Sequence, residues 1–596
     1  MRYLRRTVLG ALSCVGVLGA QAAHAAEPIM PLADVQKGMR CTAQSVVSGT
    51  DIATFDIEVL DVISGDVALR SPYILFRASG AAIDATGIGP GFSGSPISCP
   101  DAAGTYRVAG AISQGIGSYG NRVALATPIE SILGEPVEPP AETRSAPALL
   151  RAARPLATPL SIGGLSAPTA QALAIAAKRT GRPVYAAPSA PTDQRFPVQQ
   201  LRGGAAMAVG LASGDVTAGA IGTVAYVDGD KVWSFGHPLD SAGRRALFLQ
   251  DAYVYSVIDN PTGSAELSTY KLAAPGHNVG TLTNDGTFAV VGRLGTLPSS
   301  YPLTITGTDL DRNTTSTARI QLADEAGLGL PTGSSALTQV GSLAIAEVAY
   351  DLLHSTPIRQ SGSMCVAISL RERPKPMQFC NTYSGGTLGA GAGAALIADF
   401  SAATAQVDAY NFGPLHVTGV KVDVKLRRSL RQAYLLKVTA PERVRRGTTV
   451  RVRAYAQRVN GEKFAVTIPV KVPATTPLGS RRIQLDGTPG DGGGSLADAL
   501  SAVLDLSSLF ADDEDAESDG GSGPRTPKAL AALVRSVHRY DGVTTSIPPV
   551  GGSSSDDPEA AAPTGAEADA QKARQAYRNP DVRISGTARV KVRIVK

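Results

Sequence analysis

The amino-acid sequence predicts a mainly β protein built from several domains. Its 596 residues, 43% of them hydrophobic and 18% charged, have the composition of a globular chain and the length of about three or four domains. Aromatic residues make up only 5%, while 64 glycines and 40 prolines are typical of short strands joined by many turns. This balance argues against a helical bundle or a coiled coil.

The first 25 residues have the pattern of an export signal. Three arginines open the segment, an apolar run extends from Val8 to Ala20, and an A-x-A cleavage site ends at Ala25. The apolar run is too short to span a bilayer, and no later stretch reaches the ~18 apolar residues that a membrane helix needs. We therefore expect an exported protein without a transmembrane segment after cleavage. Because two of the arginines are adjacent, the export route is Sec or twin-arginine.

The chain that remains after cleavage is close to neutral. The formal charge falls from +5 to +2, with 53 basic and 51 acidic residues. This gives no reason to expect nucleic acid as a partner. Cysteine and histidine do not occur at zinc-ligand spacing, so no metal and no cofactor is expected.

Four cysteines remain once the signal, which contains Cys14, is removed. An even number in an exported chain indicates disulfides. The simplest pairing is local, Cys41 with Cys99 and Cys365 with Cys380. The alternative is four reduced, buried thiols.

Strand patterns and turn-rich stretches divide the chain into successive units. Thr54 to Ile63 alternates apolar and acidic residues, Gly222 to Phe235 is a hairpin, and Ala336 to Leu353 is helical. The acidic run Asp512 to Asp519 is typical of a solvated insert more than of a calcium site. The expected units are a signal peptide (1–25), a first β module (34–135), a connecting segment (136–205), a second β module (206–300), a mixed β/α region (301–414), a β-sandwich (415–486), an acidic Gly/Ser-rich insert (487–527) and a C-terminal segment with a terminal strand (528–596).

A candidate nucleophile lies in the first β module, in the run Gly-Phe-Ser-Gly-Ser-Pro that begins at Gly91. A serine between glycines on a tight turn exposes its hydroxyl, here that of Ser93. The main-chain N–H groups of Gly91 and Ser93 would then form an oxyanion hole. The motif alone is weak, because glycine and serine are also common in surface turns.

A candidate general base lies in the second β module. His237 follows the hairpin directly, in the run Trp-Ser-Phe-Gly-His-Pro. An isolated histidine at a strand end more often has a structural role. His277 is the second choice among the remaining histidines.

Taken together, the two segments resemble the SpoIVB-type serine peptidases, a family placed with the trypsin-like double β-barrels. The resemblance covers residues 36–300. It implies two β-barrels with a cleft between them, Ser93 as nucleophile, His237 as base and a protein or peptide as substrate. The matched stretches are Phe55-Asp56-Ile57-Glu58-Val59, Gly91 to Ile97, Ala109 to Ile112, Ala126 to Glu130, Gly222 to Tyr226, Phe235 to His237, Tyr270-Lys271-Leu272, Val279 to Leu282 and Asn284-Asp285.

The chain departs from the family pattern in three ways. The serine module precedes the histidine module, as in a circular permutation, which the mechanism allows because triads occur in different chain orders. Phe92 replaces the usual methionine before the nucleophile. The family's acid falls on Ser79-Gly80, where no carboxylate stands. Asp84 is the nearest candidate for the acid that orients the histidine, followed by three more: Asp240, Asp251 and Asp285.

Three functional hypotheses follow. The leading one is an exported serine endopeptidase that uses a Ser–His pair, with or without an aspartate. The missing family acid favours an alternative, a catalytically inactive pseudopeptidase that acts as an envelope or extracellular binding protein. A third is an adhesin-like binder that uses the arginine-rich strands near Arg427 to Arg431 and Arg443 to Arg453, although such arginines are usually the solvated face of a sheet.

Overall fold

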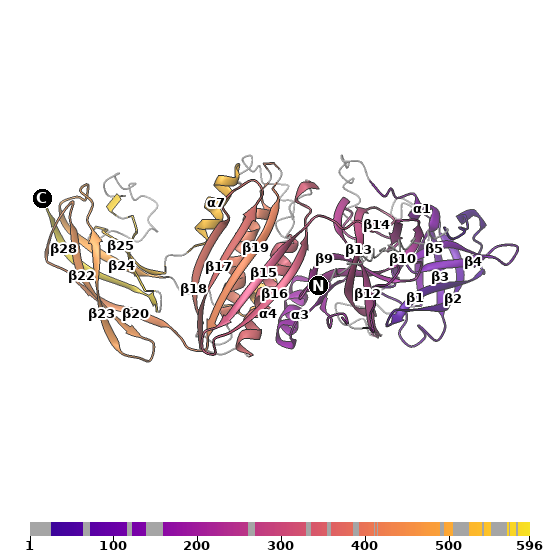
Figure 1. The fold of residues 1–596 in the computed structure, drawn as a ribbon, viewed down its shortest axis with the longest axis horizontal. Helices are drawn as coiled ribbons and strands as arrows, with labels where there is room; N and C mark the ends of the chain where they lie inside the picture. Colours follow the sequence, from indigo (N-terminus) through magenta and orange to yellow (C-terminus); the bar gives the residue numbers. More distant parts are fainter. Residues whose placement is uncertain are drawn as a thin grey trace, which may run out of the picture.

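The computed structural model shows four folded units in a row, with the N-terminal barrel at one end and the C-terminal sandwich at the other (Figure 1). The described residues are 26–63, 72–115, 122–138, 159–192, 194–259, 269–328, 335–354, 359–385, 392–410, 412–413, 415–488, 494–504, 524–538, 541–549, 569–570, 572–579 and 582–596. The export signal and the acidic run lie outside them. The mainly β class expected from the sequence is confirmed.

The first unit is a closed six-stranded barrel with the strand order β1-β2-β3-β6-β5-β4. In β2, Phe55, Ile57 and Val59 point into the barrel while the acidic residues between them face solvent, as the alternation predicts. The short helix α1 (Ile129–Leu133) follows the last strand. The strands are β1 (Arg40–Ser48), β2 (Asp51–Ile63), β3 (Tyr73–Ser79), β4 (Pro96–Pro100), β5 (Tyr106–Gly115) and β6 (Val123–Pro128).

The second unit is a second six-stranded barrel. Its strands pair in the order β9-β12-β13-β14-β11-β10, and pairing of β10 with β9 closes the ring. Beyond β10 the short strands β7 (Leu160–Gly163) and β8 (Val184–Ala186) extend the sheet. The barrel strands are β9 (Ala206–Gly214), β10 (Thr217–Asp228), β11 (Lys231–Ser234), β12 (Gly243–Ile258), β13 (Tyr270–Asp285) and β14 (Val290–Leu294).

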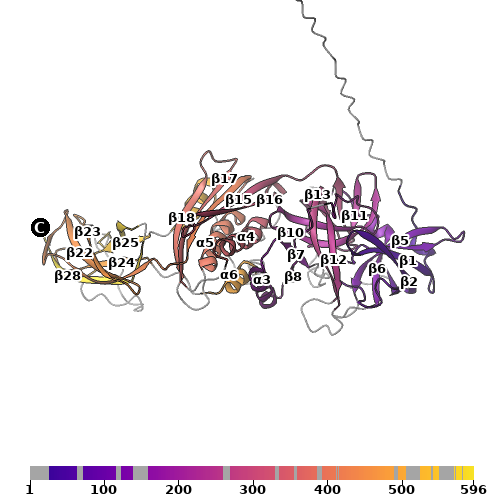
Figure 2. The same cartoon turned by 60° about the horizontal axis from the view of Figure 1, so that its bottom comes forward.

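The third unit is a sheet with helices packed on it, and β16 joins it edge to edge to β9. Figure 2 shows α3, α4, α5 and α6 gathered beside this sheet. Its strands run in the order β18-β17-β19-β15-β16, namely β15 (Ser300–Asp309), β16 (Thr314–Ala323), β17 (Gln360–Leu370), β18 (Met377–Gly385) and β19 (Val417–Arg427). Its helices are α3 (Ala167–Thr180), α4 (Ala336–Leu353), α5 (Ala392–Asp408), α6 (Leu496–Leu504) and α7 (Pro527–Ser536).

The last unit is a β-sandwich of a four-stranded and a five-stranded sheet. Apolar residues from both sheets form its core, and the arginines that alternate with them on β21 and β22 face solvent. Its strands are β20 (Gln432–Thr439), β21 (Arg443–Arg445), β22 (Thr449–Arg458), β23 (Lys463–Lys471), β24 (Gly479–Gly487), β25 (Gly542–Ser546), β26 (Arg574–Arg578), β27 (Arg583–Ser585) and β28 (Thr587–Val595).

Three boundaries differ from those expected. The strand β19 belongs to the third unit, where it pairs with β15 and β17, so the sandwich begins at β20. The acidic insert contains α6, whose Leu500 and Val503 pack into the core of the third unit. The connecting segment contains α3, which contributes Leu173 to the same core. Each of these segments carries enough apolar surface to be buried by a unit distant in sequence.

Both expected disulfides are present, which confirms the local pairing. Cys41 on β1 is bonded to Cys99 on β4 with Cα atoms 4.3 Å apart, so this bond ties together two strands of the first barrel. Cys365 and Cys380 stand directly opposite each other on β17 and β18 and are also bonded. Disulfides are typical of an oxidising compartment.

Among the described helices, α4 has the length and hydropathy of a membrane span. It begins at the N-cap Ser335, whose hydroxyl accepts a hydrogen bond from the Thr338 N–H, and ends at His354 in the left-handed conformation. Most of its residues are buried in the third unit, which is also what a core helix requires.

Candidate active site

The Ser93 turn lies on the first barrel, in the segment that leads to β4, and packs directly against the second barrel. Gly94 has a φ of +92°, and a Cβ atom there would lie 1.9 Å from the Thr223 carbonyl oxygen and 2.6 Å from the Phe235 nitrogen. Only glycine fits this contact without displacing the main chain of β10 or of Phe235. The glycine after the serine is therefore required by the interface between the barrels.

Four consecutive carbonyl oxygens of this turn, from Pro90 to Ser93, accept hydrogen bonds from the protein. The peptide planes of the turn are consequently held in one orientation. The bonds are Lys271 N–H to Pro90 O (3.0 Å), Thr223 Oγ1 to Gly91 O (2.9 Å), Ser95 N–H (2.9 Å) and Ser95 Oγ (2.6 Å) to Phe92 O, and Thr223 N–H to Ser93 O (2.8 Å).

The N–H groups of Gly91 and Ser93 are left unpaired. In a trans peptide the N–H points away from the preceding carbonyl oxygen, so anchoring Pro90 O and Phe92 O aims these two N–H groups to the opposite side. Within the described residues neither donates a hydrogen bond, whereas the N–H groups of Phe92, Gly94 and Ser95 all do. Two free N–H groups two residues apart are the donors that an oxyanion hole needs.

The His237 turn follows the end of β11 and packs against the first barrel. Phe235 and Gly236 both have positive φ, 69° and 70°, which bends the chain sharply before the histidine. The carbonyl oxygen of Gly236 accepts a hydrogen bond of 2.7 Å from Thr127 Oγ1. A Cβ atom on Gly236 would lie 3.2 Å from the Ile112 carbonyl oxygen on β5.

The two turns thus meet at the seam between the barrels. Ser93 precedes Gly94, which touches Phe235, and His237 follows two residues after Phe235. Ser93 is half-buried and the His237 side chain is only 5% exposed. The chain order of the two modules is the reverse of that in the peptidases that the sequence resembles, yet the seam brings both candidate residues to one region.

The His237 imidazole is set up to accept a proton. Its Nδ1 lies 2.6 Å from the Pro238 carbonyl oxygen. Since a carbonyl can only accept, Nδ1 carries the proton and Nε2 keeps its lone pair. Burial lowers the pKa of His237, so the ring is neutral near pH 7. A main-chain carbonyl holds the position at which a serine triad has a carboxylate.

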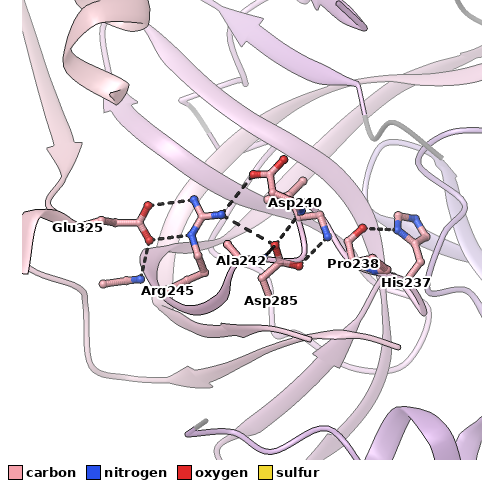
Figure 3. A network of polar contacts seen from close by, with 9 residues as sticks. His237, Pro238, Asp240, Ala242, Arg245, Asp285 and Glu325 are labelled. Carbon is pink, nitrogen blue, oxygen red and sulfur yellow. Dashed lines mark hydrogen bonds and ion pairs between the residues drawn. The ribbon is translucent and has the colours of Figure 1, made fainter. Parts of the chain in front are cut away.

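A buried aspartate holds the loop that follows His237. Asp285 accepts hydrogen bonds from the main-chain N–H groups of Leu239 and Asp240, both at 2.7 Å, and of Ala242 at 3.1 Å. Figure 3 shows Asp285 with Arg245 on one side and Pro238 on the other. Arg245 lies 3.9 Å away and forms a hydrogen-bonded ion pair with Glu325. Burial raises the pKa of Asp285, and the neighbouring Asp240 carboxylate adds to that effect. Asp285 therefore acts on the loop and not on the imidazole.

The structure does not bring Asp84 to His237. Asp84 forms an exposed ion pair of 3.2 Å with Arg122, and Asp240 forms one of 3.2 Å with Arg245. Within the described part of the chain, no carboxylate oxygen lies within 4.0 Å of the His237 ring nitrogens. Asp84 lies in the turn at residues 80–87, which directs it toward Arg122, immediately before the start of β6.

For the serine peptidase expected from the sequence, replacing Asp285 with alanine is expected to lower kcat about 10- to 100-fold, because three main-chain N–H groups lose their acceptor and the His237 loop shifts. Asp84→Asn, which removes an exposed charge, should leave kcat unchanged. Steady-state kinetics on a peptide substrate would measure both. A loss with Asp84→Asn and none with Asp285→Ala would reverse the two assignments.

A second imidazole–carboxylate pair lies elsewhere on the second barrel. His277 Nδ1 is 2.9 Å from Asp251, whose buried carboxylate also accepts the Gln199 N–H. The His277 ring packs against the Phe196 ring, with the ring centroids 4.8 Å apart and the planes tilted by 35°. Through these contacts Asp251 on β12 links His277 on β13 to the segment that precedes β9. His277, the second candidate for the base, therefore has a structural role.

Lys271 is the site residue that sequence reasoning missed. It stands near the start of β13, is 1% exposed, and places its Nζ 2.7 Å from Ser45 Oγ and 3.0 Å from Thr223 Oγ1. The signal for it was a lone lysine in the otherwise apolar run Tyr-Lys-Leu-Ala-Ala. A lysine in such a run either points to solvent or is buried with hydrogen-bond partners, and the spacing of the residues does not distinguish these two cases.

The described residues contain no group of three or more His, Cys, Asp or Glu side chains that could hold a metal. A cavity of ≈ 270 Å³ lies between the barrels, lined by residues that include Val46, Ile52, Gln199, Arg202 and Ala206. Its lining contains no histidine, cysteine or carboxylate.

No protein-family model, curated protein or solved structure matches this chain. The class of protein is therefore defined by its fold and site. It is a double β-barrel with a glycine–serine turn and a buried histidine at the seam, followed by two further domains.

Proposed function

We propose that this protein is a serine endopeptidase in which Ser93 is the nucleophile and His237 the general base. The observation that carries the proposal is the contact of the two turns across the barrel seam, through Gly94 and Phe235. Each barrel contributes one of the two groups, which is the arrangement of the trypsin-like peptidases that the sequence resembles.

In the proposed mechanism, Ser93 Oγ attacks the carbonyl carbon of a peptide while His237 Nε2 takes the hydroxyl proton. The oxyanion that forms accepts hydrogen bonds from the N–H groups of Gly91 and Ser93. His237 then gives its proton to the leaving amine, and a water molecule hydrolyses the acyl-enzyme by the same route. The Pro238 carbonyl accepts from Nδ1 and partly offsets the positive charge on the imidazolium.

Export of the enzyme is part of the proposal. The pattern of the first 25 residues and the two disulfides both support it, because disulfides persist outside the reducing cytoplasm.

One observation favours a second candidate, the catalytically inactive pseudopeptidase. His237 has a carbonyl at Nδ1 where an active triad has a carboxylate, and loss of that carboxylate lowers turnover about 10⁴-fold in a well-studied enzyme. On this alternative the protein keeps the fold for binding.

Reaction with a fluorophosphonate probe separates the two candidates. We expect the probe to label the folded protein on Ser93, as mapped by peptide mass spectrometry, because the probe requires an activated hydroxyl and an oxyanion hole. The Ser93→Ala variant should not be labelled, while Ser98→Ala, a change on β4 outside the turn, should be labelled normally. Absence of labelling in the unmodified protein would support the pseudopeptidase.

A further inference from the structure

The buried ammonium group of Lys271 lies directly beneath the Ser93 turn, between the two barrels. Its Nζ contacts Ser45 on β1 and Thr223 on β10, and stands 4.6 Å from the centroid of the Phe92 ring. Within the described residues it has no carboxylate partner at ion-pair distance. A lysine buried this deeply without a counter-ion is costly, and its hydrogen bonds are what offset that cost.

The first hydrogen-bond relay runs through Thr223. Its hydroxyl lies 2.9 Å from the Gly91 carbonyl oxygen, which can only accept, so the hydroxyl proton points at Gly91. Thr223 Oγ1 therefore accepts from Lys271 Nζ and donates to the turn.

The second relay runs through two serines. Ser95 Oγ lies 2.6 Å from the Phe92 carbonyl oxygen and 2.8 Å from Ser45 Oγ. Its single proton goes to the carbonyl, so the Ser45 hydroxyl donates to Ser95 and accepts from Lys271 Nζ. All three hydroxyl-bearing residues in the two relays are fully buried.

Both relays end on carbonyl oxygens, which only accept, so each relay begins at a donor, the Nζ of Lys271. The ammonium form of Lys271 has three N–H bonds and no lone pair. Two of its N–H bonds serve the hydroxyls and the third faces the Phe92 ring. The main-chain N–H of Lys271 also donates to Pro90. One residue thus supports three consecutive carbonyls of the turn, directly or through a hydroxyl.

We propose that Lys271 is the positioning residue of the oxyanion hole: through Ser45 and Thr223 it holds the Ser93 turn so that the Gly91 and Ser93 N–H groups face the substrate carbonyl. The inference rests on the proposed peptidase function and adds to it the group that orients the oxyanion donors. Lys271 does not touch the substrate; it acts through the turn.

Burial lowers the pKa of Lys271 to about 7. The groups that face its Nζ are the Ser45 and Thr223 hydroxyls and the Phe92 ring, none of which is charged. The folded pKa lies below that of an unfolded lysine, so burial of the charge costs stability. That cost is fully present below about pH 7 and disappears as pH rises toward the unfolded value near 10.4.

The test is the variant Lys271→Met, which keeps an unbranched side chain one atom shorter than lysine and removes every Nζ–H donor. We expect kcat for a peptide substrate and the rate of fluorophosphonate labelling of Ser93 to fall together about 10²- to 10³-fold, as when one oxyanion donor is lost. KM should change little, because the hole binds the transition state more strongly than the substrate. Ser342→Ala, at a buried serine of the third unit whose hydroxyl has no hydrogen-bond partner among the described residues, is the control and should behave as the unmodified protein.

Two milder variants keep the inference testable if Lys271→Met does not fold. Thr223→Val removes the relay to Gly91, and Ser45→Ala the relay to Ser95. Each should lower the labelling rate, and combining Thr223→Val with Lys271→Met should cost less than the product of the single effects. The free energy of unfolding of the unmodified protein, relative to Lys271→Met, should rise between pH 7 and 10, because the folded state releases the Lys271 proton near pH 7 and the unfolded state keeps it to about pH 10.4.

The possible outcomes distinguish this inference from the proposed function. Labelling of the unmodified protein and of Lys271→Met at equal rates would overturn the positioning role while leaving the peptidase in place. If the unmodified protein is neither labelled nor active, the peptidase proposal fails and the positioning role fails with it. A fall in labelling confined to Lys271→Met, Thr223→Val and Ser45→Ala would support both.

Discussion

His237→Ala is expected to lower kcat/KM for a peptide substrate by about 10⁴-fold or more, the cost of removing the base from a serine–histidine unit. The physical reason is that Ser93 then has no acceptor for its proton during attack. Ser93→Ala should lose as much, and the double variant should lose no more than either single one, because the two residues act as a unit.

The pH dependence of kcat/KM is a second measurement of the role of His237 as the base. The base works only when neutral, so kcat/KM should fall on the acid side as His237 takes up a proton. Because burial lowers the pKa of His237 below its ordinary value of 6.5, the midpoint of that fall should lie below pH 6.5.

His277→Ala is the control for both measurements, since His277 pairs with Asp251 away from the Ser93 turn. It should leave the acid limb and the labelling of Ser93 in place. Loss of activity with His277→Ala and not with His237→Ala would exchange the two histidines and overturn the proposed base.

Gly94→Ala is expected to have the largest effect on the two-barrel unit. The added Cβ would lie 1.9 Å from the Thr223 carbonyl oxygen and 2.6 Å from the Phe235 nitrogen, so main-chain atoms of the second barrel must move. We expect loss of soluble protein, or a protein that is folded but not labelled on Ser93. Thermal unfolding and probe labelling would measure these results.

Gly104→Ala is the matched control for Gly94→Ala. It also has a positive φ, +80°, but a Cβ there would meet nothing within 4 Å. It should show only the cost of the left-handed conformation, about 1–2 kcal/mol. Equal losses of stability in the two variants would mean that conformational strain, and not the contact between the barrels, makes glycine necessary at position 94.

The missing triad acid has a specific structural counterpart. The Nδ1 position of His237 is taken by the carbonyl of the next residue, and the buried carboxylate of Asp285 holds the loop that follows. A carbonyl supplies the orientation of the ring but a smaller stabilisation of the imidazolium than a carboxylate would. The proposed enzyme is therefore a Ser–His dyad, and we expect a lower turnover than that of a full triad.

The sequence by itself determined those features that depend on short spacings. Period-two alternation places Phe55, Ile57 and Val59 inside a barrel, and a cysteine pair separated by 15 residues closes across one hairpin. The glycine–serine run predicted a tight turn with free N–H groups, because glycine at positive φ is a local property of the main chain.

Only the tertiary structure decided what depends on contacts between distant segments. Lys271 meets Ser45 across 226 residues, and Asp285 reaches the His237 loop from the far end of the same strand. The strand β19 pairs with the third unit although its alternation suits the sandwich equally well. Alternation and composition predict that a side chain will be buried, but they do not predict which segment will bury it. That partner depends on how whole barrels and sheets pack, because the packing minimises the unpaired polar groups and the exposed apolar surface of the complete chain.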